Sequence, residues 1–124
     1  MSKQQMDNIL LNLVVIRSAD IERLSQFYKL LGLNFTLLYH GSGPKHYTCE
    51  LGMVVFEIYP HTDNTQNIAP TRIGFQVNSL DTLFAKLKES GVIVIFQPKD
   101  SPWGRRAVID DPDGNRVELV EKES

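Results

Sequence analysis

The chain has 124 residues, of which 42% are hydrophobic and 23% are charged, values that are ordinary for one globular domain. Its 13 basic and 15 acidic residues leave a net charge of −2, which argues against a nucleic-acid partner and a basic membrane anchor. No apolar run approaches the ~20 residues of a membrane-spanning helix, and the N-terminus lacks the apolar core of a signal peptide. The single cysteine, Cys49, cannot form an internal disulfide, so we expect a cytoplasmic protein.

The first half of the chain predicts one strand, one helix and three further strands. Residues 10–16 are branched and apolar, which is typical of a buried strand. Asp20 is a suitable N-cap for a helix whose apolar positions recur at helical spacing from Ile21 to Leu31, and Gly32 is placed to end it. Three strands are then expected at about 33–40, 45–51 and 53–59, separated by glycine-containing turns.

The second half repeats this order after a polar, proline-bounded linker at 60–70. A strand at 72–78 precedes a helix that Gly91 ends, about sixty residues after Gly32. The remaining strands are expected at 92–97, 105–110 and 116–121. The sequence therefore predicts one α+β domain over residues 1–124, built from two βαβββ modules at about 9–59 and about 71–121.

Two carboxylates occupy matching places in the two modules. Glu57 and Glu118 each lie in the middle of a strand between apolar neighbours, where glutamate is disfavoured. An outward-facing glutamate on a solvated sheet is the plainer interpretation of either residue alone. The first strand, however, is apolar on both faces, with Val14 and Ile16 on one face and Leu13 and Val15 on the second. We therefore expect that second face to curve into a cup, to pack on another subunit, or both.

The ends of the chain resemble the vicinal oxygen chelate superfamily. The resemblance rests on Asp20, Phe27-Tyr28 and Leu31-Gly32 near the start, on Pro102-Trp103-Gly104, and on the run from Asp110 to Leu119. The superfamily includes glyoxalase I, bleomycin-resistance proteins, fosfomycin-resistance enzymes and extradiol dioxygenases. The resemblance covers about residues 9–121. It implies a U-shaped mixed sheet that surrounds a cup, with the helices on the outer face.

The metal ligands of the superfamily are only half present. The resemblance places its four ligands at Leu13, Glu57, Arg72 and Glu118, so that both usual histidines are replaced. Leucine has no lone pair to donate, and arginine stays protonated. We therefore expect no cofactor and no metal, although Glu57 and Glu118 would be the ligands if a metal were present. We expect the guanidinium of Arg72 to lie between these two carboxylates instead.

Several further residues have two interpretations each. His40, His46 and His61 are surface or hairpin histidines, or else one of them is a substitute ligand or general base. Trp103, Tyr47 and Tyr59 either form aromatic walls for a flat ligand or pack in the ordinary way. Arg105 and Arg106 are either solvated strand residues or a means of attracting an anion. The run 111–114 is a type I turn rather than a calcium loop.

Three functions remain open. The first is metal-free binding of a small organic molecule in the cup, as in bleomycin-resistance-type proteins. The second is a lyase, an isomerase or a dioxygenase-related enzyme with Glu57 or Glu118 as base or with a displaced metal; whether any reaction is catalysed stays open. The third is a homodimeric interaction module without a ligand. The residues expected to line the cup are Leu13, Val15, Val55, Glu57, Tyr59, Arg72, Gln76, Trp103, Arg116 and Glu118.

Overall fold

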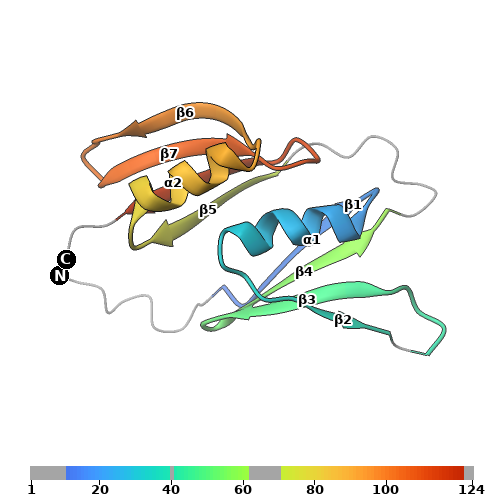
Figure 1. Ribbon diagram of the computed structural model, residues 1–124. Coiled ribbons are helices and arrows are strands. Elements are labelled where there is room, and N and C mark those ends of the chain that lie inside the picture. The colour runs from blue at the N-terminus through green and yellow to red at the C-terminus, as the bar shows by residue number, and fades with distance from the viewer. Residues whose placement is uncertain (1–10, 40, 62–70, 122–124) are drawn as a thin grey trace.

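The computed structural model describes residues 11–39, 41–61 and 71–121, and it contains two βαβββ units (Figure 1). The first unit consists of β1 (Leu13–Ser18), α1 (Ile21–Leu30), β2 (Thr36–Leu38), β3 (His46–Leu51) and β4 (Val54–Pro60). The second consists of β5 (Arg72–Val77), α2 (Leu80–Glu89), β6 (Ile93–Lys99), β7 (Arg105–Asp110) and β8 (Arg116–Glu121). The predicted order of elements and the α+β fold class are confirmed.

The boundaries of several strands differ from the prediction. The first strand runs to Ser18 instead of ending at residue 16, and the second is only three residues long. Pro60, expected to open the linker, ends β4 instead, where Ser18 lies beside it in the edge strand. The remainder of the predicted linker, apart from His61, lies outside the described residues, as does His40.

Each unit forms a separate four-stranded mixed sheet. The strand orders are β1-β4-β3-β2 and β5-β8-β7-β6. In each sheet the first and last strands of the module pair in parallel, and the other pairs are antiparallel. As a result, β1 and β5 are edge strands of their sheets.

The two helices begin differently. Asp20 caps α1 as predicted, because its carboxylate accepts a 3.0 Å hydrogen bond from the backbone N–H of Arg23. The side chain of Ser79, at the same place before α2, makes no such bond. Oε1 of Glu121 accepts from the N–H of Leu80 at 2.6 Å instead, so β8 supplies the cap.

The two helices end alike, in support of the predicted repeat. Gly32 and Gly91 have φ angles of +107° and +84°, a region that a glycine enters without strain. One residue later in each module, the backbone N–H donates a 3.2 Å bond to a helix carbonyl: Leu33 to Tyr28, and Val92 to Leu87. The chain therefore turns from helix to strand by the same geometry twice.

The side chains beneath both helices form one shared core. The predicted inward positions are confirmed, since Phe56, Ile58, Val117 and Leu119 are almost fully buried. The ring centroid of Phe75 lies 6.3 Å from that of Phe56, so β5 packs against the first module. None of the helices in the described segments has the length and apolar character needed to cross a bilayer.

The two sheets remain separate in the described part of the chain. Among the described strands, none of the first module pairs with one of the second, so the cup is not closed into one sheet. Leu13 and Val15 are 50% and 41% exposed. The expected cover over the second face of the first strand is therefore not supplied by the described part of this chain.

Candidate functional site

Nine of the ten predicted cup residues lie on two sheet faces. We call the side of the first sheet opposite α1 face A, which by register carries Leu13, Val15, Arg17, His46, Thr48, Glu50, Val55, Glu57 and Tyr59. We call the side of the second sheet opposite α2 face B, which carries Arg72, Gly74, Gln76, Ile93, Phe96, Lys99, Arg106, Val108, Asp110, Arg116, Glu118 and Val120. The tenth predicted residue, Trp103, is 74% exposed in the loop between β6 and β7.

Face A holds an imidazole beside its carboxylate. The ring of His46 stacks on that of Tyr59 with centroids 4.2 Å apart and planes 7° apart. Its Nε2 lies 4.0 Å from Oε2 of Glu57, and its Nδ1 lies 3.4 Å from the carbonyl oxygen of Pro44. The guanidinium of Arg17 lies 5.4 Å from the Tyr59 ring centroid. Glu57 is therefore set in an ordered polar and aromatic environment.

His46 is buried, with 2% of its surface exposed, which the interpretation as a surface histidine does not anticipate. A signal for this position exists in the sequence. A two-residue turn at Gly52-Met53 pairs Leu51 with Val54, and counting back along the hairpin puts Thr48 opposite Glu57. The same count puts His46 on the Glu57 face. His61, by contrast, is exposed, and its backbone N–H donates to the carbonyl of Ser18.

Tyr47 does not belong to face A. It pairs with Ile58 on the helix side of the sheet, and its hydroxyl donates a 2.7 Å hydrogen bond to Oε1 of Glu22. This bond raises the pKa of Tyr47 above its usual value. Tyr47 therefore cannot line a cup at Glu57. Tyr59 can, because it lies two residues after Glu57 in β4, on the same face of the sheet.

Face B holds a carboxylate between two guanidiniums. Nη2 of Arg72 donates to Oε1 of Glu118 at 3.2 Å. Nε and Nη2 of Arg106 lie 2.8 and 2.7 Å from Oε2 of the same carboxylate. The hydrogen bond from Arg106 holds the pKa of Glu118 below its usual range, with a further contribution from Arg72. Glu118 thus stays ionised at neutral pH.

The expected bridge by Arg72 is found on one side only. Arg72 pairs with Glu118, whereas Oε2 of Glu57 lies 4.0 Å from Nε2 of His46. Among the described residues, no ion pair joins face A to face B. The predicted cup does not include Arg106, the second partner of Glu118, although alternation along β7 places it on the opposite face from Arg105, which binds Asp81 and Asp100.

These residues do not fit the metal centre that the resemblance implies. Both oxygens of Glu118 already accept from guanidiniums, and Leu13 offers no donor atom. In the described segments, no three histidine, cysteine or acidic side chains are grouped as a metal would require. Two carboxylates on separate sheets, one of them paired with two arginines, are a poor site for a transition metal.

One cavity lies at the β5 edge of face B. It has a volume of about 620 Å³ and lies along β5, where Arg72, Gly74 and Gln76 line it together with apolar residues of the first module. The apolar members include Val14 and Phe56, which lie on the helix side of the first sheet. The cavity therefore joins the edge of face B to the junction between the modules.

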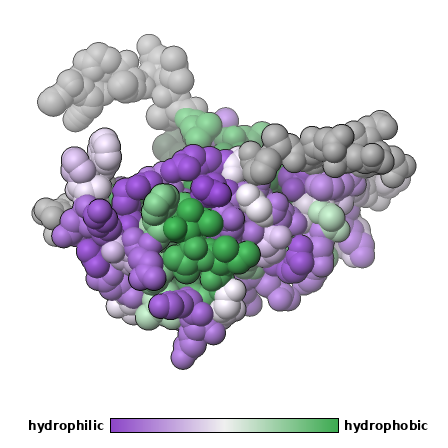
Figure 2. Space-filling model, turned by 90° about the horizontal axis from the view of Figure 1, so that it is seen from above, coloured by the Kyte–Doolittle hydropathy of each residue, from purple (hydrophilic) through white to green (hydrophobic). Residues whose placement is uncertain are grey.

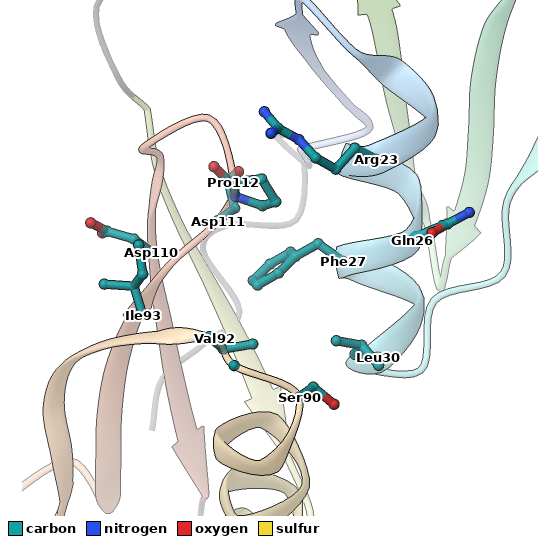
Figure 3. A pocket seen from close by; sticks show the side chains of 11 residues that line it. Arg23, Gln26, Phe27, Leu30, Ser90, Val92, Ile93, Asp110, Asp111 and Pro112 are labelled. Atoms are coloured by element: carbon teal, nitrogen blue, oxygen red, sulfur yellow. The ribbon is translucent and has the colours of Figure 1, made fainter.

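A second cavity, of about 380 Å³, lies between α1 and the second module (Figure 3). Phe27 projects into it from α1, with Val92 and Pro112 on the other side. Asp111 beside it is buried and already bound, since it accepts from the hydroxyl of Tyr28 and from the backbone N–H of Asn115. We therefore assign this second cavity to the interface between the two modules.

Apolar side chains also lie on the surface. Viewed from the side on which β6 lies in Figure 1, they form a patch that hydrophilic residues surround (Figure 2). On β6 itself, Ile93 and Phe96 are 61% and 60% exposed, and the register places both on face B. Both faces therefore combine exposed apolar side chains with a few charged groups.

A pair of βαβββ modules whose first and last strands carry the polar groups of a site defines a protein of the vicinal-oxygen-chelate type. Residues 10–119 match the Glyoxalase/Bleomycin resistance protein/Dioxygenase superfamily. The chain belongs to this superfamily, which confirms the resemblance. Comparison with the curated proteins gives no match.

Solved structures of several proteins share the fold. The oxidase ChaP-H2 is 22% identical, with a TM-score of 0.77 over 94% of this chain and 95% of that one. TnmS3, an antibiotic binding protein from Streptomyces sp. CB03234, is 24% identical, with a TM-score of 0.74 over 93% and 97%. A lactoylglutathione lyase from Agrobacterium tumefaciens is 16% identical, with a TM-score of 0.69 over 90% and 92%. At these identities the likeness establishes the fold and no more.

Proposed function

We propose that this chain binds a small organic molecule, without a metal ion, in a cup formed by face A and face B, and that it does so in the cytoplasm. The observation that carries the proposal is the ion pair between Arg72 and Glu118. The resemblance assigns a metal ligand of the superfamily to the position of Arg72, and the pair with Glu118 orients a cation there instead. A guanidinium cannot coordinate a metal, but it binds oxygen atoms of a ligand through up to five N–H donors.

The composition of the two faces supports binding. Leu13 and Val15 offer apolar surface, and the polar groups beside them are few and held in place by partners, as with Glu57 and His46. Ligand sites commonly combine apolar walls with a small number of fixed polar groups. One relative of the same fold, TnmS3, is described as an antibiotic binding protein, which is consistent with this class of function.

We further propose that a second copy of the chain completes the cup. Both β1 and β5 are edge strands, and the apolar residues of β1 on face A are exposed. Face B carries four cationic side chains and two carboxylates, whereas face A carries two carboxylates and one arginine besides His46. Face A of one copy therefore complements face B of another in charge.

A fragment screen followed by protein NMR tests the binding proposal. We expect small organic compounds to shift the backbone signals of Val15, Val55 and Glu57. Val15→Gln should weaken their binding, whereas Leu37→Gln, a matched control of similar exposure on the helix side of the same sheet, should not. Binders that leave the signals of face A and face B unchanged would contradict the proposal.

Sedimentation velocity over a range of concentrations tests the dimer. We expect reversible dimers that Val15→Lys disrupts and Leu37→Lys leaves intact. A monomer at every concentration would remove the second copy from the proposal while leaving ligand binding open. A dimer for which the fragment screen finds no ligand would favour the interaction module instead.

An enzyme is the second candidate, and the pair of His46 and Glu57 favours it. A carboxylate 4.0 Å from a buried imidazole resembles the paired groups of general acid–base catalysts. In a lyase or isomerase Glu57 would accept a proton from the ligand. Proton NMR spectroscopy of a compound recovered after incubation separates the candidates, since a lyase or an isomerase returns it with an altered structure in a Glu57-dependent manner and a binding protein returns it intact.

A further inference from the structure

Gly74 lies in the middle of β5, where nothing in residues 11–39, 41–61 and 71–121 requires a glycine. Its φ angle is not among the positive values that only glycine adopts readily. Among the described residues, a Cβ atom added to it would meet nothing closer than Glu118, whose Cβ and carbonyl oxygen both lie 3.9 Å away. Glycine weakens a strand interior, and in such places it often marks the close approach of a ligand or another backbone. The described part of the chain therefore leaves the space above Gly74 open to a ligand or another backbone.

Two side chains beside this space carry hydrogen-bond donors. Arg72 and Gln76 flank Gly74 on the same face of β5, and Glu118 lies opposite it in the register. Both flanking residues are exposed, and the side chain of Arg72 has 56% of its surface free. The cavity of about 620 Å³ is lined by Arg72, Gly74 and Gln76. A group placed over Gly74 is thus within reach of a guanidinium and an amide.

The charges beside Gly74 leave one cation in excess. Arg72 and Arg106 share the single carboxylate of Glu118, at 3.2 Å and 2.7 Å. The next arginine on face B, Arg116, has its own partner, because its Nε donates to Asp110 at 2.9 Å. One net positive charge matches a monoanion such as a carboxylate better than a phosphate dianion.

We propose that Gly74, Arg72 and Gln76 form the subsite for the carboxylate of a small organic acid. The carboxylate lies over Gly74, where a side chain would otherwise stand, and accepts hydrogen bonds from the guanidinium of Arg72 and the amide of Gln76. Glu118 holds Arg72 in position and is itself held by Arg106. This inference rests on the proposed ligand-binding function and names the class of ligand.

Matched pairs of acids and amides test the subsite. The probes are benzoate, phenylacetate and 2-naphthoate, each with its uncharged amide, and the measurement is the dissociation constant by NMR titration. A charge-assisted hydrogen bond makes at least one acid bind roughly tenfold to a hundredfold more tightly than its amide. Added salt weakens the binding of the acid and leaves the affinity for the amide unchanged.

Three variants locate the effect. Gly74→Ala retains the fold, with a melting temperature equal to or above that of the parent, because the added methyl group makes only ordinary contacts at 3.9 Å, yet it weakens binding of the acid by roughly tenfold or more. Arg72→Gln removes the preference for the acid over the amide. Arg105→Gln is the control, since it removes the same charge from an arginine that binds Asp81 and Asp100 away from Gly74, and it leaves the preference intact.

The outcomes separate this inference from the proposed function. Equal affinity for acids and amides, or a preference that survives both Gly74→Ala and Arg72→Gln, overturns the carboxylate subsite. If uncharged fragments still bind at Val15 and Val55 in that case, the ligand-binding function stands without it. If no compound of any charge binds at either face, both fail together.

Discussion

The hydroxyl of Tyr28, on α1, donates a 2.8 Å hydrogen bond to Oδ2 of Asp111, at the turn that joins β7 to β8. Both residues are buried, at 0% and 1% exposure, and burial together with the Asp111 charge raises the pKa of Tyr28 well above its usual value. Oδ1 of Asp111 meanwhile accepts from the backbone N–H groups of Asp113 and Asn115. One carboxylate therefore shapes the turn of the second module and binds the helix of the first.

Tyr28→Phe should destabilise the protein by about 1.5–3 kcal/mol, the usual range for losing a hydrogen bond to a charged group. The ring contacts with Phe27 and Phe56 would persist, so the loss is attributable to the hydroxyl. Urea unfolding at equilibrium measures it. Tyr47→Phe is the matched control, because it removes a bond of similar length to Glu22 near the surface, and it should cost less than about 1 kcal/mol.

Equal effects of these two substitutions would contradict the role of Tyr28 in joining the modules. A change in the urea dependence, without a change in midpoint, would instead indicate that the denatured state or the two-state behaviour had altered.

The pH dependence of stability should depend on Glu118. Because the hydrogen bond from Arg106 lowers the pKa of Glu118 below the 4.5 of an unperturbed group, its contribution is complete above that pH and is lost as the pH falls through the folded-state value. Glu118→Gln should therefore lower the melting temperature near neutral pH. The gap between variant and parent should close as the pH falls below about 4.5.

Thermal melts of both proteins across this range make the comparison, with Glu89→Gln as an exposed control at the end of α2. The control should track the parent at every pH. A gap for Glu118→Gln that is constant from neutral to acid would show that the arginine pair does not stabilise the ionised form.

Much of the fold follows from local patterns, and the site follows from them only in part. The alternation of apolar residues predicts that Phe56 and Val117 point inward and that Glu57 and Glu118 point outward, since period two fixes the face of every strand residue. Helix starts and stops at Asp20, Gly32 and Gly91 are likewise local signals. These features need no knowledge of distant parts of the chain.

The partners of the two carboxylates depend instead on register across strands. His46 reaches Glu57 through the β3–β4 hairpin, and Arg106 reaches Glu118 through the β7–β8 hairpin. Composition and periodicity do not determine which residues face each other across a hairpin. The length of the turn determines this register. The placement of the two sheets relative to each other depends on contacts such as Phe56 with Phe75, for which no local pattern exists.

Cys49 should be unreactive in the native protein. It is 4% exposed within β3, and burial raises the pKa of its thiol above the usual value, which lowers the fraction of reactive thiolate. A chromogenic disulfide reagent should modify the Cys49 thiol of the native protein only as fast as the protein unfolds. In denaturant the same reagent should modify it rapidly. Fast modification of the folded protein, with a rate independent of stability, would place Cys49 in an accessible setting.

The stack of His46 on Tyr59 should stabilise the protein and position Glu57. His46→Phe keeps an aromatic ring on Tyr59 but removes the polar contacts with Glu57 and Pro44, for which we expect a loss of about 1 kcal/mol. His46→Ala also removes the ring from a buried position, and we expect a loss of about 2–4 kcal/mol. Urea unfolding of both variants separates the polar contribution from the packing one. His61→Ala, at an exposed position, is the control and should match the parent. If His46→Ala were as stable as the parent, the ring would not be packed in the interior, and Glu57 would lack the support that a role in the cup requires.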